Sequence, residues 1–279
     1  MFIRSKRVII GLTTYYNENL MISLSGLSRF GRRCILIIHN DNPETKITRR
    51  QIRDIGYKGK LHIINSSRNI GLLNSRLAII DFVKQHRIKA KWFIFADDDD
   101  ILLNLDIPKI KSNHFAIIQN MAVIRTRLID VLRAIKHPQD VQIDNENVYM
   151  VRPHMGLAGT LVRAVHMMRL GDVLHYAHTG ISDVIEGLNF RPPIDMIMWS
   201  ALNIVARDSA TDVAPIYMDT INYIATDLDS VSQKYGMLLA PEKNAQDKIL
   251  AIIAKCDNVI RTSLADMATT PVGSESDRQ

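Results

Sequence analysis

Cysteine, aromatic residues and long apolar runs are all scarce in this sequence. Cys34 and Cys256 are the only cysteines among 279 residues, which excludes a disulfide framework and any CxxC metal or redox motif. No uninterrupted apolar run approaches the roughly 18–20 residues that span a bilayer. The apolar patch near the start is too short for a signal peptide. We therefore expect a cytoplasmic protein, either free or peripheral to the inner face of a membrane.

Several common catalytic templates are also missing. The sequence has no GxxxxGK[ST] phosphate loop, no GxGxxG after the first predicted strand, no HExxH and no GxSxG. These absences argue against P-loop nucleoside triphosphatases, common dinucleotide-binding enzymes, zinc metalloproteases and serine hydrolases with a GxSxG motif. His175 and His178 are three residues apart but have no evident third ligand, so we interpret them as surface or packing residues.

The composition is that of an ordinary globular protein, with 47% hydrophobic and 23% charged residues. Its length corresponds to one large domain or two small ones. The net charge of +6 is uneven, because residues 1–111 hold 20 Lys and Arg against 10 Asp and Glu. The first part of the chain should therefore attract an anion such as a nucleotide phosphate, a nucleic acid or a membrane surface.

Short apolar runs alternate with helical patterns over the first hundred residues. This alternation is typical of β-α-β units with a parallel sheet. We expect strands at 7–12, 34–39, 61–64 and 92–96, and helices at 18–30, 45–55 and 70–86. In such doubly wound α/β sheets ligands bind at the carboxyl ends of the strands. The loops that follow these strands are therefore the places to look for a site.

The second half is less regular. Apolar residues at three-and-four spacing predict a helix over 115–136, and we also expect helices over 164–170, 195–206 and 245–267. Residues 155–163 resemble a glycine-bent strand, 171–193 a mobile stretch that acts as a lid or a variable surface loop, and 268–279 a disordered tail.

Four consecutive aspartates, Asp97 to Asp100, follow the fourth predicted strand. Adjacent carboxylates repel one another and are costly to desolvate, so a divalent cation would stabilise them. Hard oxygen ligands favour Mg²⁺ or Mn²⁺, which completes its shell with substrate phosphates and water. Alternation along an extended segment predicts that Asp97 and Asp99 bind the metal together while Asp98 points away. The alternative is a solvated acidic turn with helix-capping aspartates.

Polar side chains after the other strands are of kinds that bind a nucleoside diphosphate. A guanidinium can fork onto phosphate, a carboxylate can accept a hydrogen bond from a base, and a tyrosine ring can stack. Each has a simpler interpretation as a surface arginine, an Asx turn or a first-turn helix acid. The candidates are Thr14, Tyr15, Glu18, Asp41, Arg68 and Arg76.

In this order, these segments resemble the family-2-type glycosyltransferases of the GT-A fold. The resemblance rests on the runs Thr14-Tyr15-Tyr16-Asn17-Glu18, His39-Asn40-Asp41, Arg68-Asn69-Ile70-Gly71 through Asn74-Ser75-Arg76, and Phe95-Ala96 with the four aspartates, similar to the family's DXD region. A looser match covers residues 150–235. There Ile194-Asp195 stands where the family has a glutamate-aspartate pair.

This resemblance implies a fold, an activity and a site. The fold would be a GT-A-like, mainly parallel sheet flanked by helices in one large domain, with a nucleotide-sugar half over 1–111 and an acceptor half over 112–267. The activity would be Mn²⁺- or Mg²⁺-dependent transfer of a hexosyl or pentosyl group, with inversion, from a nucleoside-diphosphate sugar, UDP-type favoured. The acceptor would be a saccharide, a lipid-linked saccharide or a nucleic acid. The resemblance assigns Thr14, Tyr15, Glu18, Asp41, Arg68, Arg76, Asp97 and Asp98 to the donor, Asp97 and Asp99 to the metal, and Asp195 to the catalytic base, with Asp183, Glu186 and Asp208 as fallback bases.

Two other functions compete with this interpretation. A nucleotidyltransferase would combine a similar sheet with acidic metal ligands, but it would need a basic glycine-rich loop directly after the first strand. A non-catalytic nucleic-acid-binding module would use the basic first half. It would need aromatics interleaved with the basic residues, and aromatics are only 6% of the chain.

Overall fold

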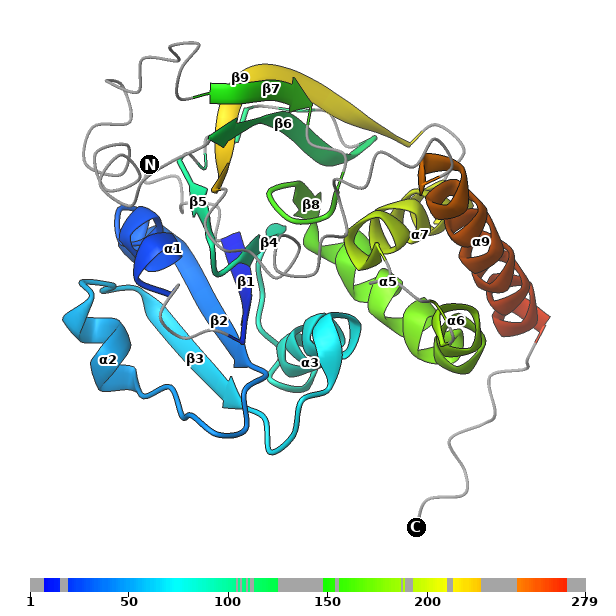
Figure 1. Cartoon of the computed structure of the whole chain (residues 1–279). Coiled ribbons are helices and arrows are strands. Elements are labelled where there is room, and N and C mark those ends of the chain that lie inside the picture. The colour runs from blue at the N-terminus through cyan, green and yellow to red at the C-terminus, as the bar shows by residue number, and fades with distance from the viewer. Residues whose placement is uncertain are drawn as a thin grey trace.

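A mixed sheet, nine-stranded within the described residues, forms the centre of the molecule (Figure 1). The computed structural model describes residues 8–15, 20–103, 105, 107–108, 110, 113–124, 148–153, 156–186, 188, 193–209, 213–226 and 245–269. The strand order is β3-β2-β1-β4-β8-β6-β9-β5, and β7 pairs with β6 beside this path. Most of the paired residues belong to parallel ladders, so the predicted mainly parallel α/β sheet flanked by helices is confirmed.

The first hundred residues form the parallel half of the sheet. Its strands are β1 (Val8–Thr14), β2 (Cys34–Asn40), β3 (Lys60–Asn65) and β4 (Trp92–Asp97), and the helices between them are α1 (Leu20–Leu27), α2 (Arg49–Asp54) and α3 (Gly71–Gln85). A short 3-10 turn, η1 (Gly31–Arg33), precedes β2. β1 and β2 are buried along their whole length, as expected of continuous apolar strands covered on both faces. All four predicted strands and all three predicted helices are confirmed, with shifted ends.

The second half extends the sheet and adds a group of helices. Its strands are β5 (Asp100–Leu102), β6 (His114–Ile124), β7 (Val148–Pro153), β8 (Leu161–Arg163) and β9 (Ala214–Thr226). Its helices are α5 (Ala164–Tyr176), α6 (His178–Ile185), α7 (Ile194–Ser209) and α9 (Ala245–Thr269), which gather on one side of the sheet (Figure 1). The described sheet is continuous between the halves, because β8 pairs antiparallel with both β4 and β6.

Alternate side chains of the strands feed two apolar cores. Ile9, Ile35 and Phe93 point into the core beneath α3, α5, α7 and α9. Ile10 and Leu36 point to the opposite face, where α1 packs. This alternation is the period-two geometry of a strand, and it gives a three-layer α/β/α arrangement.

The predicted helix over 115–136 is wrong where the structure describes it, because 114–124 is strand β6. Phe115, Ala116, Ile117 and Ile118 are all buried, so the segment is covered on both faces as a central strand. A continuous apolar run contains residues at helical spacing by chance, and periodicity alone does not separate the two structures. Residues 125–136 lie outside the described residues.

The predicted mobile stretch 171–193 is also wrong over 171–185, which belongs to α5 and α6. Its glycines are there for close helix packing rather than for loop conformation. A Cβ on Gly171 would lie 2.6 Å from Ile80 Cγ2, and one on Gly180 would lie 2.8 Å from Val259 Cγ1. These residues therefore form neither the proposed lid nor a variable loop.

The carboxyl ends of the four parallel strands come together at one edge of the sheet. Thr14 is paired with Asn40, Asn40 with Asn65, and Thr13 with Asp97. The loops that follow these residues carry most of the predicted site residues, so the topology brings them to one place.

Candidate active site

A fully buried arginine lies at the centre of this edge. Arg76, on α3, is 0% exposed, and its Nη1 lies 2.5 Å from Asp195 Oδ1 while its Nη2 lies 3.2 Å from Asp97 Oδ1. Burial alone would lower the pKa of Arg76, but the charges of Asp195 and Asp97 and their hydrogen bonds outweigh it and raise the pKa above its ordinary value. The guanidinium is therefore permanently charged, and it joins residues that are far apart in the sequence.

The surroundings of this arginine explain how the chain tolerates a buried cation. Its guanidinium carbon lies 5.3 Å from the centre of the Phe95 ring, within the range of a cation–π interaction. The Nε atom has no hydrogen-bond partner among the described residues. Two charge-assisted hydrogen bonds and one aromatic face thus replace the water that the guanidinium gives up.

Asp195, at the start of α7, is held by Arg76 and by a backbone donor. Besides Arg76, the backbone N–H of Ala158 donates to Asp195 Oδ1 over 3.0 Å. Ala158 is fixed in turn, because it forms a bridge with Phe95 of β4 and the Gly159 N–H donates to the Phe95 carbonyl over 2.8 Å. A carboxylate in the first turn of a helix is also favoured by the helix dipole. The orientation of Asp195 is therefore set by three separate elements.

Asp98 turns toward the end of β1. Its Oδ2 accepts a hydrogen bond of 2.5 Å from Thr14 Oγ1. The pKa of Asp98 is raised to about 6, mainly by burial and in part by the nearby charge of Asp97. Hydrogen bonds from Thr14 and the Tyr15 N–H act in the opposite direction and lower it. This contact draws two of the predicted donor-binding residues together.

Asp41 organises the loop that leads into α3. Its two carboxylate oxygens accept hydrogen bonds from the Ile70 N–H at 2.8 Å and the Gly71 N–H at 2.9 Å. Gly71 has a φ of +79°, a conformation that favours glycine. Each carboxylate oxygen retains a second lone pair, so the predicted contact of Asp41 with a nucleobase stays a prediction.

Two other predicted donor-binding residues, Tyr15 and Arg68, lie in the loops after β1 and β3. Tyr15 is 39% exposed directly after β1, and its carbonyl accepts a hydrogen bond from Asn42 Nδ2. Arg68 is exposed in the loop before α3. Glu18 lies outside the described residues.

The predicted metal ligands, Asp97 and Asp99, lie where β4 ends. The backbone at 98–99 is a turn, so the strand alternation from which we paired these two side chains does not hold there. No group of three His, Cys, Asp or Glu side chains within the described residues converges on a point that could hold a metal ion. A Mg²⁺ ion usually needs only one or two carboxylates beside substrate phosphates and water, so the oxygen donors of this turn fit such an ion.

The sequence did not reveal every residue that shapes the site. The backbone donor of Ala158 carries no side-chain signal, although the neighbouring Gly159, with a φ of +77°, marks the bend that presents it. Among the fallback bases, Asp208 is paired with Arg169 on the surface, and Asp183 and Glu186 are exposed on or just after α6. Of the four candidate bases, Asp195 is the one that pairs with the buried arginine in the part of the chain that the structure describes.

None of the helices within the described residues is both long and apolar enough to cross a bilayer.

Comparison with known proteins identifies similar structures but no family. No family model matches the chain, and no curated protein matches it. Solved structures that resemble it are glycosyltransferases. A mannosyltransferase from Pyrobaculum calidifontis, in complex with GDP-Man and Mn²⁺, is 9% identical with a TM-score of 0.43, over 95% of this chain and 76% of that one. The glycosyltransferase GlyE of Streptococcus pneumoniae TIGR4 is 13% identical in its apo form and 12% in a second structure, each with a TM-score of 0.36, over 90% and 87% of this chain. The chain spans about half the length of GlyE, 51% in each structure.

Proposed function

We propose that this chain is a metal-dependent glycosyltransferase that moves a sugar from a nucleoside-diphosphate sugar to an acceptor hydroxyl, with inversion. One observation carries the proposal. The buried Arg76 joins Asp97, at the end of β4, to Asp195, at the start of α7. These two aspartates are the ones that the sequence resemblance assigns to the donor and to the base, and one cation holds both.

Glycosyl transfer makes two demands on a protein. Negative charge builds up on the departing diphosphate, and the acceptor alcohol is a weak nucleophile until its proton is removed. A site that meets both demands needs cationic stabilisation on one side of the sugar and a base on the other. The arrangement around Arg76 supports this division, because the two carboxylates are held in fixed positions by opposite arms of one guanidinium.

On the donor side, Asp97 and Asp99 would hold a Mn²⁺ or Mg²⁺ ion, which would supply positive charge to the diphosphate. Thr14, which directly precedes the exposed Tyr15 in the sequence, donates a hydrogen bond to Asp98. These three residues would bind the nucleoside. The exposed guanidinium of Arg68 would reach a phosphate. The buried Arg76 would act through Asp97 rather than by contacting the donor.

On the acceptor side, Asp195 would accept the proton of the attacking hydroxyl. Its Oδ1 is held by Arg76 and by the Ala158 N–H, which fixes the plane of the carboxylate. A base that is already oriented loses little freedom when the acceptor arrives. Attack from the side of Asp195, opposite the diphosphate, inverts the configuration at the anomeric carbon.

The proposal is tested by measuring release of nucleoside diphosphate from a panel of UDP- and GDP-sugars, with Mn²⁺, with Mg²⁺ and with EDTA. We expect one donor to turn over only with a divalent ion. Asp195→Asn should lower kcat at least a hundredfold, roughly the contribution of a general base, while the donor still raises the melting temperature. Asp54→Asn is the matched control, because Asp54 is an exposed carboxylate on α2 that pairs with Arg50, away from the proposed base.

Two results would contradict the proposal. One is that no sugar nucleotide is cleaved or raises the melting temperature by mass action. The other is that Asp195→Asn retains wild-type turnover, which would move the base elsewhere.

A further inference from the structure

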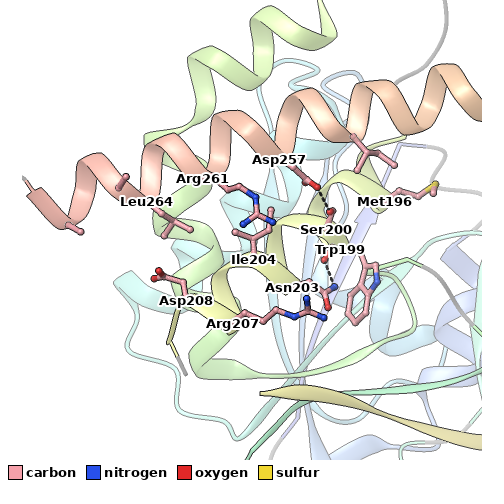
Figure 2. Close-up of a pocket in the computed structure, with 13 residues that line it drawn as sticks. Met196, Trp199, Ser200, Asn203, Ile204, Arg207, Asp208, Asp257, Arg261 and Leu264 are labelled. Carbon is pink, nitrogen blue, oxygen red and sulfur yellow. Dashed lines mark hydrogen bonds between the residues drawn. The ribbon is translucent and has the colours of Figure 1, made fainter. Parts of the chain in front are cut away.

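A groove lies between α7, whose first turn holds the proposed base, and α9. It has a volume of about 780 Å³, and its walls include Trp199, Asn203 and Arg207 from α7, and Asp257 and Arg261 from α9. Figure 2 shows these side chains between the two helices, with Arg207 and Trp199 on the α7 wall and Arg261 on the α9 wall. Its size is that of a small-molecule site.

The lining of the groove reaches the residue that follows the proposed catalytic base. Met196, one of its lining residues, directly follows Asp195 in α7. Trp199 comes four residues after Asp195, and residues at that spacing share one face of a helix. Asp195 and Trp199 therefore lie on the same face of α7. From Asp195 to Arg207 the helix rises about 18 Å, so a ligand whose hydroxyl meets Asp195 could extend along the groove.

The charges of the groove favour an anion. Neither Arg207 nor Arg261 forms an ion pair or hydrogen bond with any other described residue, and both are exposed. Asp208 is neutralised by Arg169, whereas Asp257 keeps its charge, because its Oδ2 accepts only a hydrogen bond of 2.9 Å from Ser200 Oγ and its buried Oδ1 has no partner among the described residues. The three arginines Arg169, Arg207 and Arg261 therefore outnumber these two aspartates by one. Two guanidiniums on opposite walls thus remain to bind carboxylate or phosphate oxygens.

The remaining lining suits a sugar. Trp199 stacks on Phe115, with ring centres 6.0 Å apart and planes at 27°, so the indole is held as a fixed aromatic wall. The Asn203 Nδ2 donates to the Trp199 carbonyl over 2.8 Å, which leaves the Asn203 Oδ1 able to accept from a ligand hydroxyl. An aromatic wall beside a few polar groups is typical of a pocket that orients a polar small molecule.

We infer that this groove binds the acceptor, and that the acceptor is an anionic saccharide whose carboxylate or phosphate lies between Arg207 and Arg261. This inference deepens the proposed function and rests on it for the role of the ligand. The binding itself requires no turnover, so it can be tested separately.

The chain has two tryptophans, which makes intrinsic fluorescence a direct probe. Trp92 is 0% exposed in the core, whereas Trp199 lines the groove, so a ligand there should change the emission of Trp199. The probes are tetragalacturonate for the carboxylate, glucose 6-phosphate for the phosphate, and maltotetraose as the neutral counterpart. We expect saturable changes with one or both anions, a much weaker response to maltotetraose, and loss of the signal in Trp199→Phe.

Charge-removing variants then locate the anion. Arg207→Gln or Arg261→Gln should each weaken binding about tenfold, the scale of one lost hydrogen bond to a charged group. Arg50→Gln, an exposed arginine on α2, is the matched control and should bind as wild type. Affinity should also fall as NaCl rises from about 50 to about 300 mM, since exposed charges are screened.

Several outcomes would overturn the inference. These are equal binding of the neutral and anionic probes, unchanged affinity in both arginine variants, or no response to either anion. Displacement of the probe by UDP or GDP would also overturn it, because the probe would then bind at the proposed donor site. A response to a single-stranded oligonucleotide alone would also overturn it. If Asp195→Asn kept full turnover while the arginine variants lost anion binding, the proposed base would fail and the groove site would stand.

Discussion

Removal of the Arg76 charge should destabilise the protein more than removal of any surface cation. In Arg76→Met the carboxylates of Asp97 and Asp195 lose their shared counter-ion, and breaking a buried ion pair by deleting one partner costs about 3–5 kcal/mol. The carboxylates are themselves 33% and 29% exposed, so water recovers part of this loss. We therefore expect a loss of about 2–4 kcal/mol in the free energy of unfolding, or roughly 5–10 °C in melting temperature for a chain of this size.

The measurement is urea unfolding of wild type and Arg76→Met, compared at equal m-values. Arg50→Met is the control, because Arg50 and Asp54 are 91% and 71% exposed and such pairs contribute about 0–1 kcal/mol. The reasoning gains a second test from the triple variant Arg76→Met/Asp97→Asn/Asp195→Asn. With no charge left to satisfy, it should recover much of the lost stability. Wild-type stability in Arg76→Met, or a triple variant no better than the single one, would refute the account.

Three further outcomes follow from the same contacts. Asp97→Asn should abolish metal-dependent nucleotide release while circular dichroism shows an unchanged fold, and retained turnover would remove Asp97 from the metal site. Burial lowers the pKa of His39, although the charge of Asp41 opposes this shift. The unfolded state therefore binds more protons below about pH 6.5, and the stability of the protein should fall as the pH drops below that value. In urea unfolding between pH 5 and 7, His39→Leu should flatten this pH dependence, and an unchanged slope would contradict the reasoning. Gly171→Ala places a methyl 2.6 Å from Ile80 Cγ2 and should lower the free energy of unfolding by about 1–3 kcal/mol. This loss should fall by half or more in an Ile80→Ala background. An equal loss in both backgrounds would show that this contact is not the cause.

Local sequence was enough to identify the parallel half of the fold. Strands such as 34–40 are continuous apolar runs closed by polar residues, and α3 has helical spacing over four turns. Both signals are local, because strand burial and helix amphipathicity depend on neighbours within a few residues. The same logic failed for 114–124, where an apolar run satisfies either period, and for 171–185, where the glycines that suggested a loop fit against Ile80 and Val259 from other helices.

The sequence by itself determined which residues stand at the ends of the parallel strands, because each follows an apolar run that has to be buried. Only the tertiary structure decided that Arg76, 119 residues away from Asp195, would lie between it and Asp97 with no exposure to water. That contact depends on α7 and on the bend at Gly159 meeting the end of β4, and packing between distant segments leaves no periodic signal along the chain. The groove between α7 and α9 has the same origin, since its two arginines come from helices whose spacing is set by their packing.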